Sequence, residues 1–324
     1  MTAAHMPKVL ILTDVQQAAR DRYKAVLLER FPHLSIDVVG HHEAAKPYLA
    51  DMDVLMCFSP PMADHVVRDA RKLRWIQALG TGVDNIIDLP SLGREVLVTN
   101  VRGIHGAPVS EAALATMLAL ARDLPGFVRA QDEHQWKRWP AKLLQGKTVG
   151  ILGIGVIAEA LAPKCKAMGM NVVGITSSPR KVAGFDRIHP IGELLTVLPS
   201  VDHFVLLTPY SAATHHMIDA KVFAAMKPTS FFINVARGGV VDEDALIEAL
   251  RNKKIAGAAL DVFNQEPLPP DNPLWDFKNV IITTHQGGFC DTYVDLAMPI
   301  LERNMRCFLD GKLQDMANVA RAAS

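Results

Sequence analysis

Short apolar runs alternate along the chain with longer stretches in which apolar residues recur at helical spacing. In the first third the apolar runs are KVLIL (8–12), SIDVV (35–39), DVLMCF (53–58), RWIQAL (74–79) and EVLVTN (95–100). Helical patterns at about 15–30 and 62–71 separate some of these runs. Strands that alternate with helices in this way predict parallel sheets with right-handed crossovers.

The middle of the chain repeats this alternation with stronger signals. Its candidate strands are TVGIL (148–152), NVVGI (171–175), HFVLL (203–207), SFFINV (230–235), IAGAAL (255–260) and VIITT (280–284). Continuous apolar runs are typical of a sheet that helices cover on both faces. A chain of 324 residues also suits about two domains. We therefore predict an α/β protein with two Rossmann-like or flavodoxin-like parallel-sheet domains and a cleft between them.

Two joints set the predicted domain boundaries. Residues 103–124 read as a loop that enters a helix, with Ser110 as the N-cap. Residues 287–311 hold a long amphipathic helix, and we expect this helix to return to the first domain. The predicted domains are then a substrate domain of 1–102 and 291–324, and an inserted dinucleotide-binding Rossmann domain of 103–290.

Composition narrows the class of protein. Lys plus Arg equals Asp plus Glu, 34 each, so no global charge attracts nucleic acid or acidic lipid. The four cysteines lack CxxC spacing, which favours reduced thiols over disulfides or a zinc site. The longest apolar helical run, 112–121, is too short to span a bilayer, and no signal-peptide pattern begins the sequence. We expect a cytoplasmic protein without nucleic-acid or membrane partners, and a frayed RAAS end.

A glycine turn follows the first strand of the middle region. Gly153 and Gly155, with Ala158, fit the pattern GxGxxG/A between a predicted strand and a predicted helix. Gly153 permits a sharp turn, and Gly155 lets a pyrophosphate approach the backbone. The helix start at Val156 and Ile157 supplies unpaired N–H groups and a positive dipole end. The sequence therefore predicts a dinucleotide site.

The end of the next strand lacks the acidic residue that usually holds the adenosine ribose of NAD. Thr176 stands 21 residues after Gly155, where that acid is expected. Hydrogen-bond donors and positive charge follow it: Ser177, Ser178, Arg180 and Lys181. The missing carboxylate removes repulsion of the additional NADP phosphate. We expect NADP(H) in preference to NAD(H); a solvated Arg180–Lys181 turn with bound NAD is the alternative.

Five blocks together make the sequence resemble the D-isomer-specific 2-hydroxyacid dehydrogenase family, of the glyoxylate/hydroxypyruvate reductase type. They are LGTGVDNI (79–86), the glycine turn, FFINVARGGVVDEDALIEAL (231–250), GAALDVFNQEPLP (257–269) and TTHQGG (283–288). The resemblance implies hydride transfer between NAD(P)H and a small 2-keto acid or D-2-hydroxy acid, such as glyoxylate or hydroxypyruvate.

The resemblance also implies three catalytic side chains. Arg237 would bind the substrate carboxylate and neighbouring carbonyl oxygen through its planar fork of donors. His285 would give a proton to the carbonyl oxygen in reduction and take it back in oxidation. Glu266 would hold His285 in one tautomer and favour its protonated form. Backbone N–H groups of Thr81 and Gly82 would bind the substrate carboxylate from the first domain.

Further positions are implied with the cofactor. Pro209, Val235, Ala236 and His285 would lie along its path. Asp261 would contact the nicotinamide carboxamide, although a plain cap at a strand end is the alternative. The glycine pair Gly238–Gly239 beside Arg237 would permit close approach of a ligand.

Other features carry less chemistry. Trp136 and Trp139 resemble a segment that crosses to the partner subunit in relatives, where aromatic packing of a homodimer interface is the simpler explanation. We assign the histidine pairs at 41–42 and 215–216 to the surface and expect no metal, because adjacent side chains on a strand or loop point in different directions and no cluster of Cys or Asp accompanies them.

Two other functions stay open. A formate or phosphite oxidiser could share this fold, but formate users carry an extra Asn and a Gln–His pair where this chain has Glu266 and His285. An NAD(P)-binding scaffold or sensor of the corepressor type would bind cofactor and dimerise without significant turnover. The complete set of Arg237, Glu266 and His285 argues against the scaffold.

Overall fold

The computed structural model describes residues 6–58 and 62–323. The chain divides into two compact units. We call residues Met1–Ile104 with Cys290–Ser324 the split unit, because two distant segments of the chain build it. Residues His105–Phe289 form the central unit.

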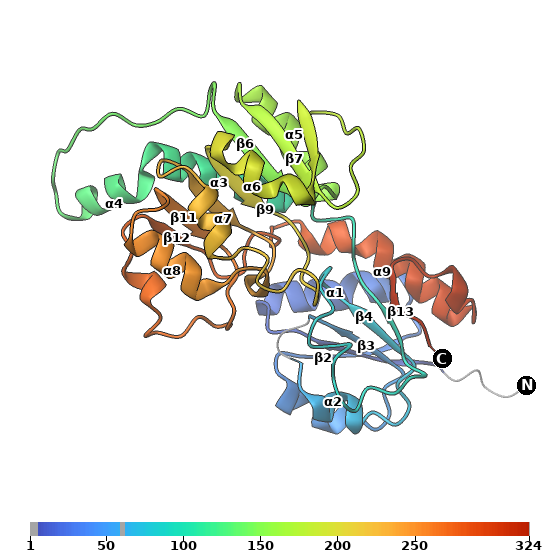
Figure 1. Ribbon diagram of the computed structural model, residues 1–324. Coiled ribbons are helices and arrows are strands. Elements are labelled where there is room, and N and C mark those ends of the chain that lie inside the picture. The colour runs from blue at the N-terminus through green and yellow to red at the C-terminus, as the bar shows by residue number, and fades with distance from the viewer. Residues whose placement is uncertain (1–5, 59–61, 324) are drawn as a thin grey trace, which may run out of the picture. The chain divides into compact units, whose positions relative to one another are not determined.

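The split unit is built on a six-stranded sheet of order β13-β5-β4-β3-β1-β2, in which only β13 runs antiparallel to its neighbour. Its first segment comprises β1 (Lys8–Leu12), α1 (Gln17–Arg30), β2 (Ser35–Val39), the 3-10 helix η1 (His42–Tyr48), β3 (Val54–Cys57), α2 (Asp64–Arg68), β4 (Trp75–Ala78) and β5 (Leu97–Thr99). Its second segment adds α9 (Tyr293–Leu309), η6 (Leu313–Asp315) and β13 (Val319–Arg321). The predicted parallel sheet of this region is confirmed (Figure 1).

Helix α9 is fixed to the sheet of the split unit by a buried polar network. The amide of Asn304 donates to Gln77 Oε1 at 2.9 Å, and the hydroxyl of Thr99 donates to the same oxygen at 2.8 Å. The indole of Trp75 in turn donates to Thr99 Oγ1 at 2.8 Å. Because each buried polar group has a partner, the network positions the helix without leaving an unpaired group in the core.

Strand β13 corrects the expectation of a frayed RAAS end. Val319 and Arg321 pair with β5, and the Arg321 guanidinium donates to the carbonyls of Gly93 and, at 3.1 Å, Val96. The expectation was wrong for Arg321, because its side chain binds two backbone carbonyls. The short polar sequence around Arg321 gives no sign of these distant partners. Ser324 lies outside the described residues.

The central unit has a seven-stranded, all-parallel sheet of order β12-β11-β10-β9-β6-β7-β8. Its strands are β6 (Thr148–Leu152), β7 (Asn171–Thr176), β8 (Arg187–Pro190), β9 (His203–Leu206), β10 (Phe231–Asn234), β11 (Gly257–Leu260) and β12 (Val280–Ile282). Its α-helices are α3 (Gly106–Arg122), α4 (Leu124–Asp132), α5 (Val156–Ala167), α6 (Leu194–Val197), α7 (Ala220–Ala225) and α8 (Glu243–Arg251). Single-turn 3-10 helices are η2 (Ile191–Glu193), η3 (Leu198–Ser200), η4 (Gly238–Val240) and η5 (Pro273–Asp276). The strand order reverses direction between β6 and β9, which is where open α/β sheets bind ligands.

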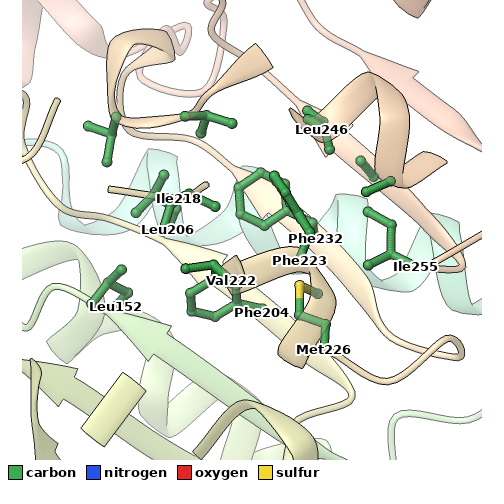
Figure 2. Close-up of a cluster of buried hydrophobic side chains, with 14 of the residues drawn as sticks. Leu152, Phe204, Leu206, Ile218, Val222, Phe223, Met226, Phe232, Leu246 and Ile255 are labelled. Atoms are coloured by element: carbon green, nitrogen blue, oxygen red, sulfur yellow. The ribbon is translucent and has the colours of Figure 1, made fainter. Parts of the chain in front are cut away.

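Apolar side chains cover both faces of the central sheet, as the continuous apolar runs predicted. On one face, residues of α6, α7 and α8 pack with Phe204 and Phe232 (Figure 2). Phe223 of α7 meets Phe232 edge to face, with ring centroids 5.4 Å apart. On the other face, α3 contributes Ala113 and Met117, and α5 contributes further apolar residues to the same core. This sandwich explains why the strands tolerate no polar alternation.

Helix α3 begins earlier than the sequence indicated. It starts at Gly106, after His105, so Ser110 is not an N-cap. Ser110 lies inside the helix, fully buried, and its hydroxyl donates to the carbonyl of Ala107 at 2.9 Å. Pro108 does not delay the start, because a proline in the first helical turn removes only an N–H that has no partner there.

Candidate active site

Arg237 stands just beyond β10, in a turn that a buried asparagine holds. The side chain of Asn234 accepts from the N–H of Ala236 at 3.0 Å and donates to the carbonyl of Arg237 at 3.2 Å. The guanidinium of Arg237 donates through Nη1 to the carbonyl of Ala236 at 2.7 Å. The turn thus fixes the direction in which the arginine leaves the strand.

The packing of the protein itself requires glycine at both positions after Arg237, and the expected role in ligand approach stays a prediction. A Cβ at Gly238 would lie 1.9 Å from the carbonyl carbon of Phe263. A Cβ at Gly239 would lie 2.7 Å from the ring of Tyr210. Neither glycine has an unusual φ, so the requirement is the close approach of the loop after β11 and of Tyr210.

His285 and Glu266 form a hydrogen-bonded pair. Nδ1 of His285 lies 2.7 Å from Oε2 of Glu266, and Oε1 of Glu266 accepts from the N–H of Phe263 at 2.9 Å. Burial raises the pKa of Glu266. The hydrogen bond and charge of His285, the N–H of Phe263 and the charge of Arg237 lower it by more, so the pKa of Glu266 lies below its usual value. An ionised carboxylate at Nδ1 favours the tautomer with a proton there.

Asp261 organises the segment that carries His285. Its carboxylate accepts from the hydroxyl of Thr283 at 2.5 Å and from the N–H groups of Gln286 and Gly287 at 2.8 and 2.9 Å. Its backbone carbonyl also accepts from the N–H of His285 at 2.7 Å, where His285 adopts φ of 56°. These contacts are those of a buried strand-end cap, the alternative reading of Asp261.

His105 is a residue of this site that the motif analysis passed over. Burial, reinforced by the charge of Arg237, lowers the pKa of His105 to about 4. A Cβ at Gly288 would lie 3.0 Å from Cδ2 of His105, so the imidazole lies against the segment after His285. Its only signal in the sequence was a histidine immediately before a helix.

The ends of adjacent strands bring these groups into one neighbourhood. β10, β11 and β12 are neighbours in the sheet, and Arg237, Glu266 and His285 follow them in that order. The charge of Arg237 acts on both Glu266 and His105, which places the four side chains within electrostatic reach of one another. The arrangement offers a cation for an anionic ligand and an imidazole oriented for proton transfer.

The glycine turn between β6 and α5 has the form that a dinucleotide needs. Gly153 adopts φ of 96°, and a Cβ there would meet the backbone of Leu207 and Thr208 at 2.9 and 2.8 Å. A Cβ at Gly155, in contrast, would meet nothing within 4 Å, so the space beside it is open. The first N–H groups of α5 follow at Val156 without a side-chain cap. Turn, open space and helix N-terminus together fit a pyrophosphate.

The end of β7 carries the residues expected to bind the ribose. Thr176 Oγ1 accepts from the N–H of Ser178 at 3.3 Å, and Ser177 and Ser178 are exposed. Arg180 forms an ion pair with Glu159 in the first turn of α5. The motif analysis did not include Glu159, because one glutamate on a helix surface carries no distinguishing signal.

The remaining candidate residues lie at strand ends. Pro209 follows β9 and is exposed, whereas Val235 and Ala236 follow β10 and are partly or fully buried. In the split unit, Thr81 and Gly82 follow β4, and the carbonyl of Thr81 accepts from the side chain of Asn100 at 2.8 Å.

The histidine pairs do not point in different directions, contrary to the sequence argument. The rings of His41 and His42 lie 4.0 Å apart, and those of His215 and His216 stack at 3.9 Å. Neither pair lies in a strand, and outside a strand the backbone does not hold adjacent side chains on opposite sides. In α4 and the segment after it, Trp136 is 94% exposed, while Trp139 stacks on Phe127 at 4.1 Å.

The parallel central sheet and its glycine turn are those of an α/β protein that binds dinucleotides. Residues 114–287 match the family model described as D-isomer specific 2-hydroxyacid dehydrogenase, NAD binding domain. The chain belongs to the D-isomer specific 2-hydroxyacid dehydrogenase family, which confirms the resemblance. Among residues 6–58 and 62–323, moreover, no helix is both long and apolar enough to cross a membrane.

The curated relatives include D-3-phosphoglycerate dehydrogenases and glyoxylate reductases. D-3-phosphoglycerate dehydrogenase of Methanocaldococcus jannaschii is 35% identical over 96% of this chain. Glyoxylate reductase of Korarchaeum cryptofilum is 33% identical over 81% of each chain. The chain spans only 59, 42 and 53% of the lengths of three D-3-phosphoglycerate dehydrogenases it matches.

Solved structures share the whole described fold. A D-isomer specific 2-hydroxyacid dehydrogenase family protein from Aeromonas salmonicida is 34% identical, with a TM-score of 0.87 over 97% of this chain and 98% of its own. An NADPH-dependent glyoxylate/hydroxypyruvate reductase from Sinorhizobium meliloti, solved with NADP and sulfate, is 26% identical, with a TM-score of 0.82 over the same shares.

Proposed function

We propose that this protein is an NAD(P)-dependent oxidoreductase that interconverts a small 2-keto acid and its D-2-hydroxy acid. The observation that carries the proposal is the pairing of His285 with Glu266 beside Arg237, on the same unit as an open dinucleotide turn. The names of the glyoxylate reductase relatives agree with this chemistry and suggest glyoxylate or hydroxypyruvate as substrate.

The cofactor belongs to the central unit in this proposal, and the split unit supplies substrate contacts. Gly153, Gly155 and the N-terminus of α5 would hold the pyrophosphate, because open space and unpaired N–H groups meet there. The nicotinamide cofactor supplies hydride in one direction and accepts it in the other. Thr81 and Gly82 of the split unit would offer backbone N–H groups to the substrate carboxylate.

The protein's own groups handle charge and the proton. Arg237 binds the carboxylate of the substrate, and its fixed positive charge also stabilises negative charge that develops on the carbonyl oxygen. His285 gives a proton to that oxygen in reduction and removes it in oxidation. Glu266, through Nδ1, keeps the imidazole oriented and in one tautomer.

The decisive experiment replaces His285 and compares the variant with one in which a histidine of another histidine–glutamate pair is replaced. His285→Ala should lower turnover about 10²–10⁴-fold and leave cofactor binding nearly unchanged. His189 provides the control, because its Nδ1 lies 2.7 Å from a carboxylate oxygen of Glu193 in the same geometry, at β8. His189→Ala should keep full turnover.

The assay follows oxidation of NADPH and NADH with glyoxylate, hydroxypyruvate and phenylpyruvate. Full turnover of His285→Ala, or an equal loss in His189→Ala, would remove His285 from the mechanism. Saturable cofactor binding by the wild-type protein without turnover on any 2-keto acid would favour the sensor function instead.

We propose NADP(H) as the preferred cofactor. Arg180 and Lys181 supply the positive charge at the end of β7. The Sinorhizobium meliloti reductase, which was solved with NADP, has the same fold. Glu159 competes for Arg180, so Glu159→Gln should strengthen NADPH binding more than NADH binding. Arg180→Ala should weaken NADPH more than NADH, and adding Lys181→Ala should enlarge the difference; Arg187→Ala is the charge-matched control for the single variant. Equal losses for both cofactors would contradict this preference.

We also propose a homodimer formed through the central unit. Exposed apolar side chains gather in and after α4: Leu124, Phe127, Val128, Trp136 and Leu143. Exposed apolar groups at this density are typical of a contact surface. Val128→Asp with Trp136→Asp should convert a dimer to a monomer in light scattering after size exclusion, while Leu195→Asp, at another exposed leucine, should not.

A further inference from the structure

Three potential metal ligands meet at one place in the split unit. His42 and Glu43 open η1, and His65 lies in α2. Nδ1 of His42 is 3.5 Å from Oε1 of Glu43, and Nε2 of His65 is 4.0 Å from the same oxygen. One ligand atom from each residue lies within 4.8 Å of the other two. Within residues 6–58 and 62–323, no other group of three His, Cys, Asp or Glu side chains has this proximity.

The nitrogen of His42 that faces Glu43 has no hydrogen-bond partner in the described part of the chain, although solvent does not reach it. A buried polar atom without a partner costs free energy, and such atoms commonly mark the position of an ion or water.

Lys46 and His41 leave the three ligands in place, whereas Nε2 of His65, 3.4 Å from the carbonyl oxygen of His42, gives up that long contact when it binds a metal. Lys46 binds Oε2 of Glu43 at 2.5 Å, so Oε1 is the oxygen that faces the imidazoles. His41 is engaged differently, because its Nδ1 accepts from the N–H of Glu43 at 3.2 Å and caps η1. The ion-pairing lysine and the capping histidine thus hold Glu43 from two sides.

Two of the three separations between ligand atoms are near those around a tetrahedral ion, and the third, between the two imidazoles, lies within 4.8 Å. Ligand atoms about 2.1 Å from zinc stand about 3.4 Å from one another. The 3.5 Å separation already meets this value, and the 4.0 Å separation needs a shift that the half-exposed Glu43 side chain can supply. Two imidazoles and one carboxylate are a ligand set that zinc accepts, with water in the fourth position.

We propose that His42, Glu43 and His65 form a zinc-binding site that ties η1 to α2 in the split unit. The site is separate from the proposed hydride chemistry, in which no metal takes part. Its effect is structural: a metal bound to the folded protein and not to the unfolded chain raises the stability of the split unit by mass action.

The test is a titration of the metal-free protein with zinc chloride in an isothermal calorimeter. We expect one zinc site in the wild-type protein. His65→Ala should weaken zinc binding by more than about 100-fold, which is the largest loss typical of a residue that supports a ligand without binding the metal itself. His42→Ala should behave likewise. His33→Ala, which removes an exposed histidine of the same unit, should bind as the wild type does.

Thermal unfolding provides a second readout that does not depend on enzyme activity. Zinc should raise the melting temperature of the wild type and of His33→Ala but not of His65→Ala. Far-ultraviolet circular dichroism at the start of each titration identifies a variant that has failed to fold, and Glu43→Gln then replaces it. Absence of zinc binding in the wild type, unchanged affinity in folded His65→Ala, or equal loss in His33→Ala would each overturn the site.

Discussion

Buried His203, at the start of β9, should make the central unit sensitive to acid. The side chain is 3% exposed, packs against Phe231, and its Nδ1 has no hydrogen-bond partner among the described residues. Burial lowers the pKa of His203 to about 4; Asp202 opposes the shift, while Lys142 and Lys147 add to it. Below pH 6.5 the unfolded chain therefore binds a proton that the folded chain excludes.

The size of the effect follows from these two pKa values. At pH 8 the histidine is neutral in both states, so its ionisation contributes nothing to the free energy of unfolding. At pH 5 the unfolded form is favoured by about RT ln 30, or about 2 kcal/mol. Stability from neutral burial is thus complete above pH 6.5 and is lost as the pH falls towards 4.

His203→Phe removes the titration and keeps an aromatic ring beside Phe231. Urea unfolding of both proteins at pH 8 and pH 5 gives the free-energy difference between them at each pH. We expect the variant to gain about 2 kcal/mol relative to the wild type between pH 8 and pH 5. The same difference at both pH values would refute the assignment of a depressed pKa to His203.

Three further predictions concern the active site. Gly238→Ala should lower the free energy of unfolding of the central unit by about 1–3 kcal/mol in urea, because the new Cβ would strike Phe263. Gly155→Ala, where a Cβ meets open space, should leave that free energy unchanged but should weaken cofactor binding in a fluorescence titration. Asp261→Asn should cost about 1–3 kcal/mol and lower kcat, because an amide cannot accept all three hydrogen bonds. Glu266→Gln should lose stability relative to the wild type at pH 7, and this difference should shrink as the pH falls below 4.5, since the lowered pKa of Glu266 stabilises the folded state only while the carboxyl is ionised.

The strong apolar runs allowed most of the fold to be predicted, since each buried strand needs a continuous apolar segment. Strand β8 escaped prediction because RIHP, at the edge of the sheet, carries two exposed residues and a proline. β13 escaped because two of its three residues are exposed and its pairing depends on β5, more than 200 residues earlier in the chain. Local pattern contains no information about such a partner.

Motifs identified the residues of the candidate site more readily than their surroundings. Arg237, Glu266 and His285 stand in distinctive blocks, whereas His105 and Glu159 become notable only through neighbours distant in sequence. The glycines at 238–239 illustrate the converse. The sequence shows that glycine is present, but only coordinates distinguish room for a ligand from room for Phe263.

The split unit has a consequence for synthesis of the chain. Residues of α9, among them Leu301, Met305 and Phe308, complete the same core as Leu27 of α1 and Trp75 of β4. A ribosome makes the early segment first and the segment of α9 only after the entire central unit has emerged. Until then α1 alone of these two helices covers this core, and the apolar residues that α9 will cover lack their partners. The nascent chain must shield them, by collapse or by a chaperone, while the central unit is made.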